Sequence, residues 1–383
     1  MKLSENKIDV WILIPVLLLI IFGIGAVYSA SSNYSLSRFN DANYMLKQHL
    51  MKVVIALIVL FFFTNLDYKY YQQYGKLMMW LSIALLIIVF VGFASELKGA
   101  TRWIKLGPLN FQPSDLAKFT LIIYLSCLLV RKKNYLHLLY KGYLPLLFYI
   151  VVVTILVAMQ PNFSTSIIIF GSSMLLLLIT NVKIKHLAVT MASMIPFVAL
   201  FIYSKAYIIE RLTYHSDFTT GGSSNYQLIQ AIIGFGNGGI LGVGPGNSLQ
   251  KEFFLPEAYG DFIYSIVGEE YGFIGTIAVL LLFIIILIRG YKVSKLINDD
   301  FGKYLSFGIT TILSSYAVVN MSVACGIIPT TGVPIPFVSY GGTALIINSM
   351  AIGILLNISK NSRRGTEKVT DLSKNAEDNY LTR

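Results

Sequence analysis

Residues 10–30 of the chain read VWILIPVLLLIIFGIGAVYSA, an apolar run without a charged side chain. A transmembrane helix needs about 20 such residues to cross the hydrocarbon core of a bilayer. A single run of this kind could be a helix buried in a soluble core, but similar runs recur along the chain up to residue 358. Recurrence from end to end favours a protein with several membrane spans.

The amino-acid composition agrees with a membrane protein. Of the 383 residues, 55% are hydrophobic and 13% are charged, and the mean hydropathy is +0.68. A soluble domain carries about 25% charged residues. The first apolar run is longer than the core of a signal peptide and further spans follow it, so we expect it to be a retained helix.

Ten membrane spans are predicted from the apolar runs. They cover about residues 10–30, 49–65, 76–94, 115–130, 143–159, 165–181, 186–204, 262–288, 304–326 and 338–358. We therefore expect an all-α membrane protein of about ten transmembrane helices. Residues 1–360 would form a single transmembrane domain, and the polar residues 361–383 a disordered cytoplasmic tail.

The net charge of +11 and the isoelectric point near 9.4 have two possible explanations. The protein binds anionic partners, or its Lys and Arg residues follow the positive-inside rule of membrane topology. With the N-terminus in the cytoplasm, most of the 30 Lys and Arg residues fall in the cytoplasmic loops and tail. Topology therefore explains the basic excess, and no nucleic-acid partner is expected. The same rule predicts a multi-pass protein of the cell (inner) membrane with both termini in the cytoplasm.

The segments on the outer side are long, rich in Gly and Pro, and carry polar motifs. The largest is an extracytoplasmic loop of about residues 205–261, between the seventh and eighth predicted helices. It contains an amphipathic stretch at residues 226–235, followed by Gly-rich turns up to Gly246. Because the loop has many apolar residues, we expect it to fold against the outer face of the membrane.

The first outer motif runs from Gly99 to Lys118 and ends in FQPSDLAK. Pro113 suits a helix start, and Asp115 in the first turn complements the helix dipole. Asp115 and Lys118 share a helix face and could pair, or Lys118 could extend its ammonium to the membrane surface. Alternatively, Arg102, Lys105 and Lys118 could hold a pyrophosphate through charge-assisted hydrogen bonds.

Two further outer motifs have both a structural and a functional reading. Residues 160–165, QPNFST, join two spans and could form a tight turn alone. Residues 328–337 and 339–342 are rich in Pro and Gly, which implies broken helices. Irregular backbone at membrane depth is tolerated where it is buried in protein or lines a cavity. This segment could therefore be a helix kink or the wall of a substrate cavity.

Acidic side chains cluster around the start of the eighth predicted span. Glu257 and Asp261 are four residues apart, so a helical turn would bring two carboxylates together. Glu269 and Glu270 lie further inside the span, where carboxylates are functional candidates by default. Their structural alternative is pairing with a neighbouring helix. Asp261 lies where membrane meets water and keeps access to solvent, so we favour a functional role for it.

Taken together, these motifs resemble the SEDS family (shape, elongation, division and sporulation), which includes FtsW and RodA. The resemblance extends over almost the whole chain, from YSAS at residues 28–31 to NISK at residues 357–360. Residues 244–251 (GPGNSLQK), residues 268–270 (GEE) and the NISK ending are more similar to FtsW than to RodA. The resemblance therefore favours a division enzyme, with a RodA-like role in elongation and cell shape as the alternative.

The resemblance implies an activity. SEDS proteins are peptidoglycan glycosyltransferases that work with a class B penicillin-binding protein, a transpeptidase, among other proteins of division or elongation complexes. Their substrate is lipid II, a disaccharide-pentapeptide carried in the membrane on undecaprenyl pyrophosphate. This chain is therefore expected to polymerise lipid II into glycan strands during septal cell-wall synthesis. The position of Asp261 matches the essential acidic residue of the family.

The sequence departs from the family pattern at several positions. In the turn QPNFST, Asn162 and Ser164 stand where the family has Asp and Gly, so this turn carries no carboxylate. Asp115 stands where Glu is usual, and residues 259–260 are Tyr-Gly instead of His-Thr. Because Asp261 is intact, the pattern indicates a divergent lineage and not an inactive enzyme.

In the expected mechanism, Asp261 is the general base for the 4-hydroxyl of the acceptor GlcNAc, which attacks C1 of the donor MurNAc with inversion. The departing undecaprenyl pyrophosphate needs positive charge for stabilisation. A divalent cation, Mg²⁺ or Mn²⁺, is a candidate cofactor without assigned ligands. The expected substrate-binding residues are Arg102, Lys105, Asp115, Lys118, Gln160, Arg211, Glu257, Glu269 and Ser339.

Two other functions remain open at this point. A lipid II flippase would also have many helices and polar residues near the midplane. The polar motifs of this chain cluster on one face, however, which favours chemistry at that face. A non-catalytic scaffold that recruits division proteins is the third reading, and it predicts that Asp261 is dispensable.

Overall fold

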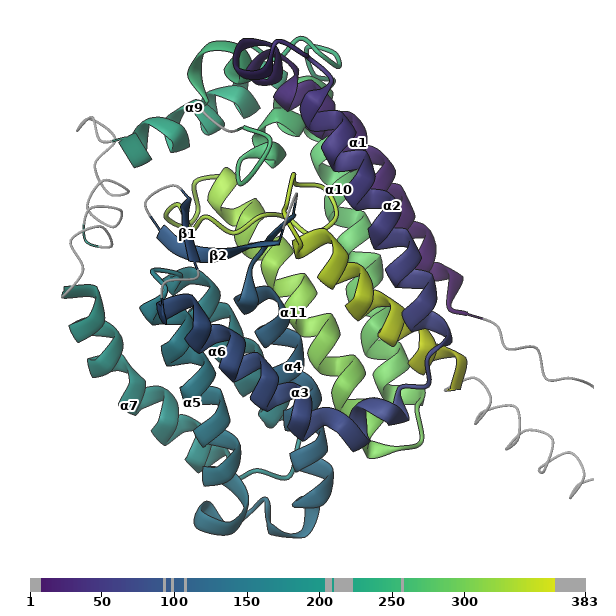
Figure 1. Ribbon diagram of the computed structural model, residues 1–383, viewed down its shortest axis with the longest axis vertical. Coiled ribbons are helices and arrows are strands. Elements are labelled where there is room, and N and C mark those ends of the chain that lie inside the picture. Colours follow the sequence, from purple (N-terminus) through teal and green to yellow (C-terminus); the bar gives the residue numbers. More distant parts are fainter. Residues whose placement is uncertain are drawn as a thin grey trace, which may run out of the picture.

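The computed structural model describes residues 8–91, 94–97, 100–106, 109–203, 209, 223–255 and 258–361. Long helices make up most of this part of the chain and lie side by side as a bundle (Figure 1). The helices are α1 (Val10–Phe39), α2 (Tyr44–Asn65), α3 (Lys69–Ile88), α4 (Pro113–Arg131), α5 (Leu144–Met159), α6 (Phe163–Leu178), α7 (Ile184–Tyr203), α9 (Ser223–Gly238), α10 (Ile263–Leu296), α11 (Asp300–Ala324) and a last helix (Ala344–Asn361). Shorter helical turns are η1 (Val89–Val91), η2 (Lys133–Tyr135), η3 (Leu139–Tyr143) and η4 (Gln250–Phe254).

Each apolar run predicted as a span overlaps one of the long helices. Among the described residues, seven helices are long and apolar enough to cross a membrane, and α6 and residues Ile184–Leu200 of α7 are shorter apolar helices. The chain is therefore a helical, multi-pass membrane protein. Several helix ends differ from the prediction, because α1 and α10 continue well beyond the apolar runs at 10–30 and 262–288.

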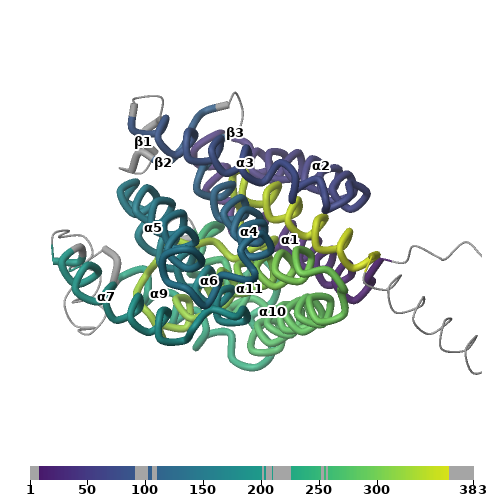
Figure 2. The backbone as a smooth tube through the Cα atoms, turned by 90° about the horizontal axis from the view of Figure 1, so that it is seen from below, coloured from purple at the N-terminus to yellow at the C-terminus, as the bar shows by residue number. Residues whose placement is uncertain are grey.

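The centre of the bundle is formed by α4, α11 and the last helix. In α4, 89% of the apolar window is buried, whereas the corresponding share in α2 and α10 is 28%. Figure 2 shows α4 and α11 surrounded by α3, α5, α6 and α10. Polar side chains on the central helices therefore face other protein groups and not lipid, which makes buried ion pairs and amide contacts possible there.

A small antiparallel sheet departs from the all-α prediction. Strands β1 (Ala94–Leu97), β2 (Ala100–Leu106) and β3 (Leu109–Phe111) pair in the order β1-β2-β3 between α3 and α4. The predicted span at 76–94 is therefore wrong at its end, since α3 stops at Ile88 and β1 follows after η1. Pairing in the sheet satisfies the hydrogen-bonding backbone groups of this non-helical connection. The sequence did not reveal the strands, because strands of three to seven residues leave no clear hydrophobic period.

The amphipathic stretch predicted at residues 226–235 forms most of α9. This helix packs against the first turns of α10, where the rings of Phe235 and Tyr264 are 5.8 Å apart. A Cβ atom at Gly238 would clash with the backbone carbonyl of Gly268, so the two helices approach each other closely. Part of this loop therefore packs against the helical bundle, through α9 and α10.

A break in α10 at Gly272 separates the outer turns of this helix from the rest. Gly272 has φ 63° and ψ −161°, a conformation that only glycine adopts readily. The backbone of the preceding loop fills the break: Phe273 donates to the Gly239 carbonyl at 2.9 Å, and Val243 donates to the Glu269 carbonyl at 3.0 Å. Hydrogen bonds at the break therefore join residues 239–244 to α10, the helix that follows Asp261.

Replacing Gly272 with alanine should lower the stability of the protein. The strained conformation costs about 1–3 kcal/mol for a residue with a Cβ, and that Cβ would also clash with the Ile240 carbonyl. The expected result is a clearly lower Tm of the purified protein. The matched control is Gly171→Ala in α6, where a Cβ meets nothing within 4 Å; equal Tm values for the two variants would contradict the role assigned to Gly272.

Candidate active site

Asp261 lies in the turns of residues 258–262, directly before α10, and is half-buried. The side-chain amide of Asn320, on α11, donates hydrogen bonds of 2.7 Å to the backbone carbonyls of Asp261 and Val333. Asn320 is itself buried. It therefore ties the turn that carries Asp261 to the non-helical segment of residues 325–343.

An apolar cavity of about 340 Å³ lies beside this turn. Its wall includes Gly332 from the non-helical segment, Phe163 and Ile167 from α6, and Val198 from α7. A Cβ atom at Gly332 would be 3.6 Å from Oδ2 of Asp261, so the carboxylate adjoins one wall of the cavity. The segment predicted as a kink or a cavity wall thus lines a cavity.

Arg102 brings a positive charge to the same cavity. It lies on β2, lines the cavity, and donates to the backbone carbonyls of Gln160, at 3.1 Å, and Pro161. Gln160 is buried, and its side chain donates to the Leu86 carbonyl at 2.9 Å. Arg102 and the α5–α6 turn therefore form one structural unit at the cavity, while the Gln160 side chain supports the fold.

Asp115 and Lys118 form a buried ion pair within the bundle. The Lys118 ammonium is 2.9 Å from Asp115 Oδ1, and the Lys118 side chain is 1% exposed. The ammonium also lies 4.0 Å from the centre of the Tyr316 ring on α11. The predicted pairing is confirmed, and the alternative of a lysine extended to the membrane surface is wrong because α11 covers this face of α4.

The remaining predicted binding residues lie in different places. Lys105 is exposed on β2. The buried Ser339 hydroxyl accepts a hydrogen bond of 3.0 Å from the Ile335 backbone and closes a turn in the non-helical segment. Arg211 and Glu257 lie outside the described residues. Residues 258–262 form turns, and the predicted stacking of Glu257 on Asp261 lies outside the described residues because it involves residue 257.

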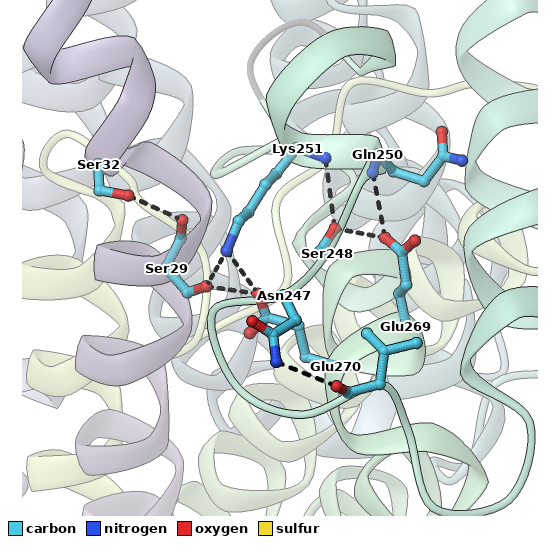
Figure 3. Close-up of polar contacts among 9 residues, drawn as sticks. Ser29, Ser32, Asn247, Ser248, Gln250, Lys251, Glu269 and Glu270 are labelled. Atoms are coloured by element: carbon cyan, nitrogen blue, oxygen red, sulfur yellow. Dashed lines mark hydrogen bonds and ion pairs between the residues drawn. The ribbon is translucent and has the colours of Figure 1, made fainter.

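Glu269 and Glu270 are both engaged in a buried polar network on α10 (Figure 3). Oε1 of Glu270 is 2.9 Å from the Lys251 ammonium and accepts from the Ser29 hydroxyl of α1 at 2.5 Å. Glu269 accepts hydrogen bonds from the Ser248 hydroxyl and, at 3.3 Å, from the Gln250 backbone. The network joins α1, α10 and the segment before Asp261, as the structural alternative for these acids anticipated.

Sequence reasoning missed several residues of the site. Asn320 is an amide in an apolar span, which is itself a signal of a functional or positioning role in a membrane helix. Lys251 stands in a polar loop motif, and only its contact with Glu270 shows its role. The described residues contain no group of three His, Cys, Asp or Glu side chains that could hold a metal ion.

The fold and the site define a class of protein, namely multi-pass membrane proteins with a half-buried carboxylate beside an apolar cavity. The sequence model of the family described as "Cell cycle protein", which is named after FtsW, RodA and SpoVE, matches residues 10–364. The chain belongs to this FtsW/RodA/SpoVE family, as its motifs indicated.

Named relatives support the family and its helical architecture. The probable peptidoglycan glycosyltransferase FtsW of Geobacter metallireducens is 35% identical over 356 residues, which cover 92% of this chain and 95% of the relative. Stage V sporulation protein E of Bacillus subtilis is 33% identical over 366 residues, which cover 95% of this chain and 100% of the relative. A chain in the solved structure of a peptidoglycan synthase complex that coordinates polymerization and crosslinking has a TM-score of 0.78 at 22% identity, covering 93% of this chain and 98% of that one. The last comparison shows a shared fold.

Proposed function

We propose that this chain is a peptidoglycan glycosyltransferase that polymerises lipid II into glycan strands. The observation that carries the proposal is the half-buried Asp261 beside an apolar cavity, with Arg102 at the same cavity. A carboxylate at such a place can accept a proton from a sugar hydroxyl, and an apolar cavity suits a prenyl-linked substrate. The named relatives, which include a probable peptidoglycan glycosyltransferase, support the same activity.

In the proposed reaction, the 4-hydroxyl oxygen of the acceptor GlcNAc forms a bond to C1 of the donor MurNAc. The hydroxyl proton passes to the Asp261 carboxylate, and the bond from C1 to the pyrophosphate oxygen breaks with inversion at C1. Undecaprenyl pyrophosphate leaves with the bonding electrons. The positive charge of Arg102 at the cavity is placed to stabilise that leaving group, whereas the buried Lys118 is already paired with Asp115.

The membrane arrangement proposed for the chain has ten spans with both termini in the cytoplasm and Asp261 on the extracytoplasmic side. The distribution of Lys and Arg residues supports this orientation. In this arrangement the loop that includes α9 lies outside between the seventh and eighth spans, and residues 361–383 are a cytoplasmic tail. The spans of α6 and α7 are short, and α7 stands at the edge of the bundle (Figure 1).

The proposed biological setting is septal wall synthesis during division, in a complex with a class B penicillin-binding protein. FtsW relatives at 33–35% identity support the division role, and the similar fold of a chain in a synthase complex supports a transpeptidase partner. Elongation is the alternative setting, because the family also includes RodA. Depletion of the protein in its host distinguishes them: filaments indicate division, and round cells indicate elongation.

Labelled lipid II, incubated with the purified protein with and without a class B partner, tests the activity. The expected product is a ladder of glycan chains on a gel, formed by the wild-type protein. Translocation of labelled lipid II across liposomes without any lengthening would instead identify a flippase. If the protein neither lengthens nor translocates lipid II, with or without the partner, the proposal is contradicted and the non-catalytic scaffold is favoured.

A further inference from the structure

Two buried side chains on α2, His49 and Lys52, have no hydrogen-bond partner within the described part of the chain. His49 and Lys52 are 0% and 4% exposed, and they are three residues apart, so they share a face of the helix. Neither ring nitrogen of His49 has a hydrogen-bond partner. In the described part of the chain, Lys52 takes part in no hydrogen bond or ion pair; its ammonium lies 4.0 Å from the centre of the Tyr340 ring.

The other well-buried lysines of the described residues show what Lys52 lacks. Lys118 has the Asp115 carboxylate at 2.9 Å, and Lys251 has the Glu270 carboxylate at 2.9 Å. A cation inside a membrane protein is costly unless an opposite charge compensates it. The face of the Tyr340 ring attracts the Lys52 ammonium, but it supplies no acceptor for the three N–H groups. The N–H groups of the Lys52 ammonium are therefore suitable donors for an anionic ligand.

The position also adjoins the segment that carries Asp261. The Tyr340 backbone donates a hydrogen bond of 2.9 Å to the carbonyl of Tyr259, two residues before Asp261. The rings of Tyr340 and Tyr259 are 5.6 Å apart in an edge-to-face contact, and the His49 ring is 5.8 Å from that of Tyr340. Lys52 and His49 thus pack against Tyr340, which is hydrogen-bonded to the turn that carries Asp261.

The apolar cavity beside Asp261 is a different place. Its wall comes from β2, the α5–α6 turn, α6, α7, α11 and residues 328–332, and includes no residue of α1 or α2. Figures 1 and 2 both draw α2 and α7 on opposite sides of the bundle. The cavity wall and the Lys52 contact with Tyr340 are therefore contributed by different elements of the bundle.

We infer that Lys52 and His49 bind the pyrophosphate of a second lipid-linked substrate. The inference rests on the proposed function, because glycan polymerisation needs two prenyl pyrophosphates at once, one on the donor and one on the acceptor. A lysine ammonium and an imidazole N–H are suitable donors for phosphate oxygens. One substrate then occupies the apolar cavity near Arg102, and the other reaches Asp261 from the side of α2.

Native mass spectrometry of the full-length protein, titrated with undecaprenyl pyrophosphate, tests this inference by counting bound molecules. We expect the wild-type protein and Lys52→Arg to bind two molecules. Lys52→Met should bind one molecule tightly, and its affinity for the second molecule should be at least tenfold weaker than that of the wild-type protein. The matched control is Lys47→Met, on the same helix, whose side chain is 69% exposed and pairs with Asp41; it should still bind two.

The Tm of Lys52→Met separates a ligand site from a structural role. Because this lysine has no acidic partner among the described residues, its replacement by an apolar side chain should leave the Tm of the ligand-free protein unchanged or raise it. A lowered Tm would show that the charge stabilises the fold. Two undecaprenyl pyrophosphate molecules bound equally well by Lys52→Met would overturn the inference.

Control ligands identify the source of the phosphate. Undecaprenol, which lacks phosphate, should bind alike to wild-type protein and Lys52→Met. Phosphatidylglycerol that fills the Lys52-dependent site as tightly as undecaprenyl pyrophosphate would show a site for bulk lipid and overturn the assignment to substrate. Polymerisation of lipid II by the wild-type protein is measured in parallel. If a second undecaprenyl pyrophosphate binds in a Lys52-dependent way but no polymer forms, only the proposed function is contradicted. If polymer forms but no Lys52-dependent second binding is seen, only this inference is contradicted.

Discussion

Replacing Asp261 with asparagine should reduce lipid II polymerisation by roughly 10²–10⁴-fold, the usual contribution of a general base. Asparagine keeps the size of the side chain but cannot accept the proton of the acceptor hydroxyl. The turn should keep its position, because Asn320 holds the backbone carbonyl of Asp261 and not its carboxylate. Glycan chain yield at equal protein concentration, together with Tm, measures the two effects separately.

The control for this variant is Asp41→Asn, in the α1–α2 connection. Its carboxyl group is exposed, and its pKa is lowered because the Lys47 ammonium and the Asn43 backbone donate hydrogen bonds to it. It is an acid outside the cavity, so its loss should leave polymerisation unchanged. A wild-type yield of glycan from Asp261→Asn would remove Asp261 from the mechanism and favour the flippase or scaffold readings.

The largest expected effect on stability comes from Lys118→Met. This change leaves the Asp115 carboxylate buried without its cation, and breaking a buried ion pair costs about 3–5 kcal/mol. Among the described residues, Oδ2 of Asp115 has no hydrogen-bond partner, so the carboxylate depends on Lys118 for compensation. We expect a strongly lowered Tm and poor recovery of the protein from detergent extracts, measured against the wild type.

The double variant Asp115→Leu/Lys118→Met separates charge balance from substrate binding. With both charges removed, much of the lost stability should return, since replacing a buried ion pair by apolar residues is often neutral or stabilising. Recovery of polymerisation along with Tm would show a structural role for the pair. Recovery of Tm without activity would show that Asp115 or Lys118 also contacts substrate, as their sequence context suggested.

An exposed ion pair provides the contrast for the buried one. Lys133 and Asp300 join the η2 turn to the start of α11, with side chains 54% and 33% exposed. The hydrogen bond to Asp300 raises the pKa of Lys133, yet solvent screens such pairs and they contribute little to stability. Lys133→Met should therefore leave Tm nearly unchanged, and a drop as large as that of Lys118→Met would contradict the importance given to burial.

The sequence alone predicted the class of fold because membrane spans are local. A bilayer requires about 20 consecutive apolar residues in each helix, and that requirement can be read without knowing any contact. The helix start at Pro113 and the helix within residues 226–235 are local features as well. The sheet of β1 to β3 was missed because its strands are short and pair across turns.

The candidate site could be predicted only in part. Asp261 and Arg102 stand in recognisable motifs. In the structure Arg102 lines the cavity, and the Asp261 carboxylate lies next to Gly332 in the cavity wall. The hydrogen bond from Asn320 to the Asp261 backbone carbonyl, and the closeness of Gly332 to the Asp261 carboxylate, join segments about 60 to 70 residues apart. No spacing rule connects such segments, since their contact depends on how α10 and α11 pack.

The sequence by itself thus determined that the chain is a multi-pass membrane protein with an acid before a long span and basic groups nearby. Only the tertiary structure decided which charges are already compensated. It pairs Lys118 with Asp115 and Lys251 with Glu270, and it leaves Lys52 against an aromatic ring. The reason is physical: the cost of a charge depends on the distance to its nearest partner in a medium of low dielectric constant, and packing sets that distance.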